Sequence, residues 1–114
     1  MRNSIPVLGA VLALFSFSSN AATDCNGTVT RVLLYGDGTV NLLASYRNDY
    51  TVLCNTNGTF GSVPGDVCLS WYGTLLNAAS HGKQVNVYYG VTLTCATLPT
   101  YWSAPVPTYV GLIS

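Results

Sequence analysis

The chain has 114 residues and a formal net charge of +0, with only 7% charged residues. This composition provides no basic patch that would neutralise phosphates, so it excludes nucleic acid as the expected partner. There is no Glu, and the surface must be built largely from Thr, Asn, Ser, Gly and Tyr. Such a surface suits a protein that is merely soluble, or one that binds polar uncharged ligands and other subunits.

The N-terminus has the three parts of a secretory signal peptide. Arg2 precedes an apolar run over residues 5–17, and small residues follow up to Ala22. The run is shorter than the roughly 20 residues that span a membrane, and a buried N-terminal helix is the alternative. We expect a signal peptide over residues 1–22, cleaved after Ala21 or Ala22, a secreted or periplasmic protein, and no membrane span after cleavage.

The remaining residues, 23–114, predict a single domain with a core of marginal size. Its four cysteines indicate two disulfides, because an exported short chain needs such cross-links. A zinc site is the competing interpretation, but no Cys pair has the C-x-x-C spacing and His81 is the single histidine.

Four cysteines permit three pairings. We favour Cys54–Cys68, because Cys54 ends a predicted strand and Cys68 opens a predicted helix on either side of a Gly-rich loop. The remaining bond, Cys25–Cys95, would link the first strand to the late β region.

The first half predicts three strands, because Thr, Val and apolar alternation dominate between polar turns. The expected strands cover residues 27–35, 39–46 and 50–55, with turns at 36–38 and 47–49. The Gly-rich stretch 55–65 predicts a loop.

A helix of about three turns is expected next. Asp66 is the predicted N-cap, the apolar stripe includes Trp71 and Leu75, and Gly82 is the predicted residue after the C-terminus. Strands are expected over residues 84–89, 92–98 and 109–113, with irregular chain around the prolines. The order β-β-β-α-β-β predicts a mainly β fold with one helix, an OB-like five-stranded barrel. An open α+β sheet is the alternative.

No catalytic set is visible, and we predict no enzyme activity, no cofactor and no metal site. His81 lies at the expected helix end, where a capping hydrogen bond explains it. The four Asp residues fall at turns, at the helix start or near the N-terminus, and no Ser has a G-x-S-x-G context.

Aromatic residues are abundant, with eight Tyr and two Trp. Tyr and Trp combine an apolar ring with a polar tip, which suits sugar stacking and subunit interfaces. We expect Trp71 and Tyr109 in the core, whereas Trp102, in a Pro-rich loop, is a candidate for ligand stacking.

Residues 54–89 resemble the B subunit of subtilase cytotoxin and its pertussis-like and typhoid-toxin relatives. The shared features are the Cys54/Cys68 pair around a Gly/Ser loop, a Tyr/Leu-rich helix, and Gly82 leading into the QVNVYY segment. The resemblance implies an OB-fold subunit, a homopentamer, a toxin A subunit as partner, and binding of sialylated cell-surface glycans.

The resemblance also implies glycan-binding positions. Asn26 stands where the family has a sialic-acid-contacting Ser, and Tyr89 is the second residue of the family's Tyr-Tyr pair. Strand alternation instead places Tyr89 inward and Tyr88 outward, so both are kept. With Trp102, these residues form the predicted glycan-binding set. The alternative function is a small exported structural or interaction protein with neither ligand nor catalysis.

Overall fold

A computed structural model describes residues 22–114 of the protein. The predicted signal peptide, residues 1–22, lies outside the described residues apart from Ala22. Within the described part, no helix is both long enough and apolar enough to span a membrane.

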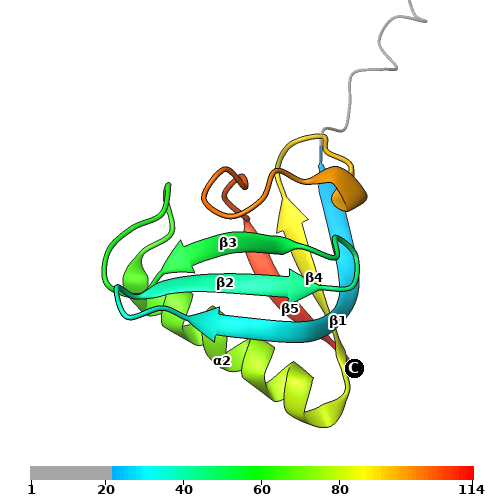
Figure 1. The fold of residues 1–114 in the computed structure, drawn as a ribbon, viewed down its shortest axis with the longest axis horizontal. Helices are drawn as coiled ribbons and strands as arrows, with labels where there is room; N and C mark the ends of the chain where they lie inside the picture. Colours follow the sequence, from blue (N-terminus) through cyan, green and yellow to red (C-terminus); the bar gives the residue numbers. More distant parts are fainter. Residues whose placement is uncertain (1–21) are drawn as a thin grey trace, which may run out of the picture.

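The longest strand, β1 (Thr23–Leu34), organises the fold because it bends and serves two halves of one sheet (Figure 1). Its first half, up to Thr28, pairs with β4, and its second half, from Val29, pairs with β2. Gly27 lies close to this change of partner, where a Cβ atom would be 2.5 Å from the Ser45 hydroxyl oxygen and 3.1 Å from the Tyr46 amide nitrogen. The close approach of residues 45–46 therefore favours a residue without a side chain at this position.

The sheet has five antiparallel strands in the order β3-β2-β1-β4-β5. The other four strands are β2 (Thr39–Ala44), β3 (Tyr50–Asn55), β4 (Gln84–Tyr89) and β5 (Tyr109–Ile113). Together with one described helix and two disulfides, this sheet confirms the predicted mainly β class. No ladder joins β3 to β5 in the described residues, and the OB-like barrel stays a prediction.

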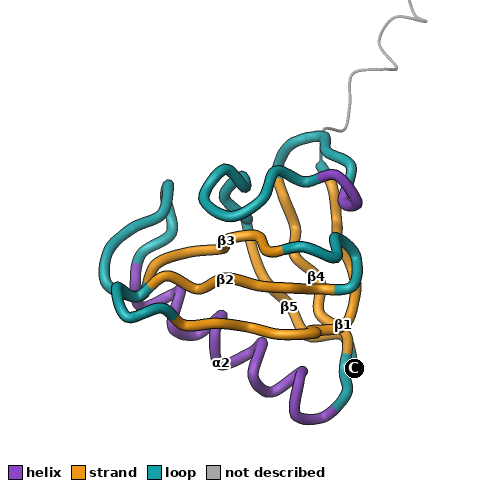
Figure 2. The backbone as a smooth tube through the Cα atoms, viewed as in Figure 1, coloured by secondary structure: helices purple, strands orange, loops and turns teal. Residues whose placement is uncertain are grey.

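The helix α2 (Gly65–His81) connects β3 to β4 and packs against the curved sheet (Figure 2). Its buried stripe is spaced by three or four residues, as an amphipathic helix requires, and consists of Cys68, Trp71, Leu75 and Ala78. This stripe confirms the predicted core position of Trp71. With 17 residues, the helix is longer than the predicted three turns.

The prediction that Asp66 caps the helix is wrong. The N-cap is Pro64, whose extended backbone precedes a helix that already begins at Gly65. Asp66 therefore lies in the first turn, where its carboxylate accepts a hydrogen bond from the Val67 amide and faces the positive end of the helix.

The prediction for the other end of the helix is confirmed. Gly82 adopts a left-handed conformation with φ of 63°. In this conformation the Gly82 and Lys83 amides both donate to the Ala78 carbonyl. Such a terminus favours glycine because other residues pay steric strain at positive φ.

Both disulfides form as predicted. Cys54–Cys68 closes the loop before α2, and Cys25–Cys95 links β1 to the segment after β4. The predicted strand over residues 92–98 is wrong. This segment contains a short 3-10 helix, Cys95–Thr97, and makes no ladder with any of the five strands. Pro99, directly after this segment, has no amide hydrogen to donate to a ladder, and the disulfide holds Cys95 beside β1.

Candidate functional site

The structure separates the four predicted glycan-binding residues. Asn26 and Tyr88 share the outer face of β1 and β4, where their ladder pairs, Asn26–Asn86 and Asp24–Tyr88, are separated by the inward-facing Cys25–Val87 pair. Tyr89 is on the opposite face and is completely buried, so its ring is not available to a surface ligand. Trp102 lies elsewhere, on the long connection between β4 and β5, and is 53% exposed.

Trp102 belongs to a chain of four aromatic rings, which we name the ring cluster: Tyr35, Trp102, Tyr101 and Tyr50. Tyr35 meets Trp102 edge to face, with ring centroids 5.5 Å apart. Trp102 stacks on Tyr101 at 6.1 Å, and Tyr101 contacts Tyr50 at 5.8 Å. These distances are typical of attractive aromatic pairs, so the rings form one continuous surface.

The backbone of Tyr101 fixes the ring cluster to the edge of β3. Its amide donates to the Tyr50 carbonyl at 2.8 Å, and its carbonyl accepts from the Val52 amide at 3.1 Å. Tyr101 also has a positive φ of 52°, which is unusual for a residue with a side chain. The two backbone bonds and the ring contacts offset the cost of this conformation.

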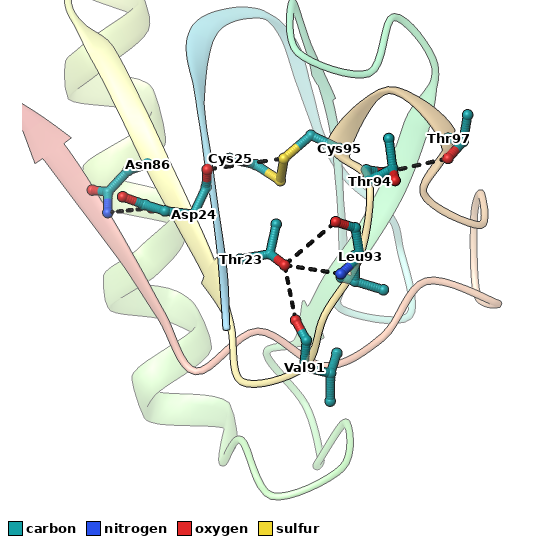
Figure 3. The surroundings of a disulfide bond; sticks show 9 residues. All are labelled: Thr23, Asp24, Cys25, Asn86, Val91, Leu93, Thr94, Cys95 and Thr97. Carbon is teal, nitrogen blue, oxygen red and sulfur yellow. Dashed lines mark hydrogen bonds between the residues drawn. A yellow bond between two sulfur atoms is a disulfide. The ribbon is translucent and has the colours of Figure 1, made fainter. Parts of the chain in front are cut away.

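Further contacts anchor the connection that carries Tyr101 and Trp102. Figure 3 shows the Cys25–Cys95 disulfide beside Thr23, whose hydroxyl donates to the Val91 carbonyl and accepts from the Leu93 amide, each at 2.9 Å. Further along the chain, Arg47 donates from Nε to the Leu98 carbonyl at 2.7 Å. The connection between β4 and β5, which contributes no strand to the sheet, is thereby anchored at several points.

Polar groups lie beside and beneath the ring cluster. The buried Asn41 donates from its side-chain amide to the Tyr35 hydroxyl at 3.1 Å, and its Oδ1 atom has no partner among the described residues. Arg31 lies with Nη1 3.4 Å from the Tyr50 hydroxyl. On the surface the aromatic faces are therefore combined with the Arg31 guanidinium, whereas Asn41 supports the Tyr35 hydroxyl from the interior.

Sequence reasoning selected Trp102 but missed its three partners. Tyr35 adjoins the predicted turn at 36–38 and Tyr50 begins a predicted strand, so the sequence does predict that both lie at strand ends, where side chains are partly exposed. Their contact with Tyr101 and Trp102 spans about half of the chain, and no local pattern encodes it.

A second aromatic feature is the stacked pair, Tyr88 and Tyr109, on the outer face of β4 and β5. Their rings are nearly parallel, at 6°, with centroids 4.8 Å apart. The prediction that Tyr109 is a core residue is wrong, since it is 44% exposed. The ladder pairs Tyr109 with the outward-facing Tyr88, and the strand alternation turns Val110 toward the core instead.

Two tyrosine hydroxyls lie in the interior between the halves of the sheet. The Tyr46 and Tyr89 hydroxyl oxygens are buried and have no hydrogen-bond partner among the described residues. Burial raises the pKa of Tyr89 to about 12 and also raises the pKa of Tyr46, because the charged form is poorly solvated. Both groups are therefore neutral phenols at physiological pH.

The described residues contain no detected pocket. Nor do they hold a group of three or more His, Cys, Asp or Glu side chains positioned for a metal. The ring cluster is thus an open surface. Comparison with protein-family models, with curated proteins and with solved structures finds no match to this chain.

Proposed function

We propose that the protein is an exported binding subunit and that the ring cluster is its glycan-binding surface. The observation that supports this most directly is the run of four contacting rings, two of which, Tyr101 and Trp102, are more than 40% exposed. Exposed, pre-positioned aromatic rings lose little conformational entropy on binding and present apolar faces to the C–H side of a sugar.

Charge favours a glycan over a single-stranded nucleic acid as the ligand. Aromatic stacking would suit both, but nucleic acid also needs a positively charged groove along its backbone. Residues 22–114 contain one Lys and two Arg, three positive charges in all, against four Asp, which gives a formal charge of −1. The accessible polar groups around the rings are tyrosine hydroxyls and the guanidinium of Arg31, which can hydrogen-bond the hydroxyl groups of a sugar.

The proposal keeps Trp102 from the predicted set and omits Tyr89, which is buried. Asn26 and Tyr88 lie on the other aromatic face and provide controls. Secretion or a periplasmic location follows from the expected signal peptide, and the two disulfides are typical of compartments outside the cytoplasm. Homo-oligomer formation and a toxin A subunit enter the proposal from the resemblance to toxin B subunits.

A glycan array, followed by titration of any hit, tests the proposal. We expect Trp102→Ala to weaken binding at least tenfold, about 1.4 kcal/mol, whereas Tyr88→Ala keeps wild-type affinity. A Trp71→Phe variant leaves Trp102 as the single tryptophan, so its fluorescence should respond to the ligand. A folded protein with no array signal would instead favour the alternative, a small exported structural or interaction protein with neither ligand nor catalysis.

A further inference from the structure

The two ends of the sheet differ in how their outer edges are occupied. The edge of β3 is bridged by Tyr101, through the two backbone hydrogen bonds to Tyr50 and Val52. The edge of β5 has no such cover. Among the described residues, the backbone hydrogen bonds of 109–113 are confined to the β4 ladder.

The β5 edge also lacks three of the features by which monomeric proteins protect such edges, namely charged residues, proline and a β-bulge. Residues 109–113 contain no charged residue and no proline, and the ladder with β4 runs without a bulge. Apolar side chains project on both faces, with Tyr109 44%, Leu112 40% and Ile113 38% exposed. An unprotected neutral edge of this kind is a template for pairing with another strand.

We infer that β5 pairs with β5 of a second copy of this chain, antiparallel and around a two-fold axis at Gly111. The inference rests on the homo-oligomer in the proposed function and specifies it as a two-fold dimer, in place of the homopentamer that the resemblance implies. In this register Tyr109 lies opposite Ile113 of the partner subunit, and Val110 lies opposite Leu112 of the partner subunit. Aromatic and β-branched residues are favourable cross-strand neighbours.

The strand itself argues for a second copy as the occupant. A two-fold interface brings the same patch together from both subunits, so the patch must complement itself. β5 meets this condition because it is neutral, and because each exposed side chain lies opposite an apolar side chain. The stacked pair, Tyr88 and Tyr109, would then continue across the interface onto Ile113 of the partner subunit.

Occupation of the β3 edge favours a two-fold dimer over a ring. A ring requires two different patches that join head to tail, and the different patch available to β5 in the sheet would be the edge of β3. Tyr101 already uses the backbone groups of Tyr50 and Val52 there. The β5–β5 contact displaces no backbone hydrogen bond of the described residues. Since one short strand per subunit is a small interface, below about 1,200 Å² in total, we expect a concentration-dependent dimer.

A pair of double variants tests both the interface and its register. In Tyr109→Lys/Ile113→Lys, like charges face each other at both ends of the proposed contact, and we expect a monomer. In Tyr109→Lys/Ile113→Glu, opposite charges face each other, and we expect the dimer to return. Both variants lose the same Tyr109 ring and Ile113 side chain, so each controls for the stability of the other.

The measurement is sedimentation velocity of the exported protein, without its expected signal peptide and without glycan, over about 1–200 μM, with circular dichroism to confirm folding. A wild-type monomer throughout this range, a five-fold assembly, or the same oligomeric state in both double variants would overturn the inference. Glycan titration of the Lys/Lys variant separates the two proposals, because its ring cluster is unchanged. Glycan binding by a monomeric Lys/Lys variant would support the proposed function whether or not the wild-type protein forms a dimer.

Discussion

The ring cluster and the stacked pair are both exposed groups of aromatic rings, but different forces hold them in place. The stacked pair lies on two adjacent strands, and the ladder between β4 and β5 positions its rings. The ring cluster combines residues from the β1–β2 turn, from β3 and from the connection after β4. Its geometry therefore depends on the anchors of that connection, whereas the stacked pair depends on the sheet alone.

Removal of the Cys25–Cys95 disulfide should produce the largest difference between the ring cluster and the stacked pair, because it should disturb the ring cluster alone. The bond closes a sequence separation of 70 residues, so chain entropy predicts a loss of about 4 kcal/mol in the free energy of unfolding. The Cys25→Ser/Cys95→Ser variant should also lose the ordered environment of Trp102. Urea unfolding and tryptophan fluorescence in the Trp71→Phe background would measure both effects.

The matched control is Cys54→Ser/Cys68→Ser, which opens a separation of 14 residues. We expect a smaller loss, about 3 kcal/mol, and an unchanged Trp102 environment below the unfolding transition. Equal changes in Trp102 fluorescence for the two variants would show that the disulfide does not selectively anchor the ring cluster.

Alkaline pH should lower the free energy of unfolding through the two buried tyrosines, Tyr46 and Tyr89. The pKa of Tyr89 is raised to about 12 in the folded state from 10.0. Its contribution is therefore fully present below pH 10 and is lost as the pH rises from about 10 to 12. For a shift of two units this is about 2–3 kcal/mol. Tyr46 contributes in the same direction.

Tyr89→Phe removes a buried hydroxyl that has no partner among the described residues, so it should leave stability at pH 7 unchanged or slightly higher. It should also reduce the alkaline decline without abolishing it, because Tyr46 still contributes. Tyr88→Phe, one residue away on the outer face, is the control and should keep the wild-type decline. Urea unfolding at several pH values from 8 to about 11.5 would measure this. A wild-type decline in Tyr89→Phe would show that other groups cause it.

Local patterns predicted most of the sheet, because they record which face of a strand is buried. The segments 50–55, 84–89 and 109–113 match β3, β4 and β5. Both disulfides also followed from the order of elements. The predicted strand over residues 39–46 ends earlier, at Ala44, because the Arg47 and Asn48 amides turn back to the Ala44 carbonyl.

Contacts between residues that are distant in the sequence could not be predicted from local sequence patterns. Asn41 is a polar residue that is nevertheless fully buried, with its side-chain amide bonded to Tyr35 of the ring cluster. The segment 92–98 has strand-like composition, yet it contains a 3-10 helix and joins no ladder of the described sheet. Trp102 was a candidate from its loop setting, whereas its ring partners depend on the three-dimensional path of the loop.

Substitution of Arg47 should disturb the ring cluster less than removal of the Cys25–Cys95 disulfide. Its Nε donates to the Leu98 carbonyl at 2.7 Å, and charged hydrogen bonds of this kind contribute about 1.5–3 kcal/mol. Arg47→Ala should lower the free energy of unfolding by about 2 kcal/mol and weaken glycan binding, with Arg47→Lys intermediate. Urea unfolding and ligand titration are the measurements. Unchanged affinity in a destabilised Arg47→Ala variant would mean that Leu98 and Trp102 are not coupled.

The smallest expected effect is the coupling between the rings themselves. Double-mutant cycles with alanine should give about 0.5–1.5 kcal/mol for Tyr88 with Tyr109, and a similar value for Tyr35 with Trp102. In the Arg47→Ala background the two values should diverge. The Tyr35–Trp102 coupling should fall, because the connection that carries Trp102 has lost an anchor, whereas the Tyr88–Tyr109 coupling should persist, because the β4–β5 ladder still positions both rings. Equal declines would place both aromatic groups under the control of global stability, and the distinction between a loop-anchored and a sheet-anchored surface would fail.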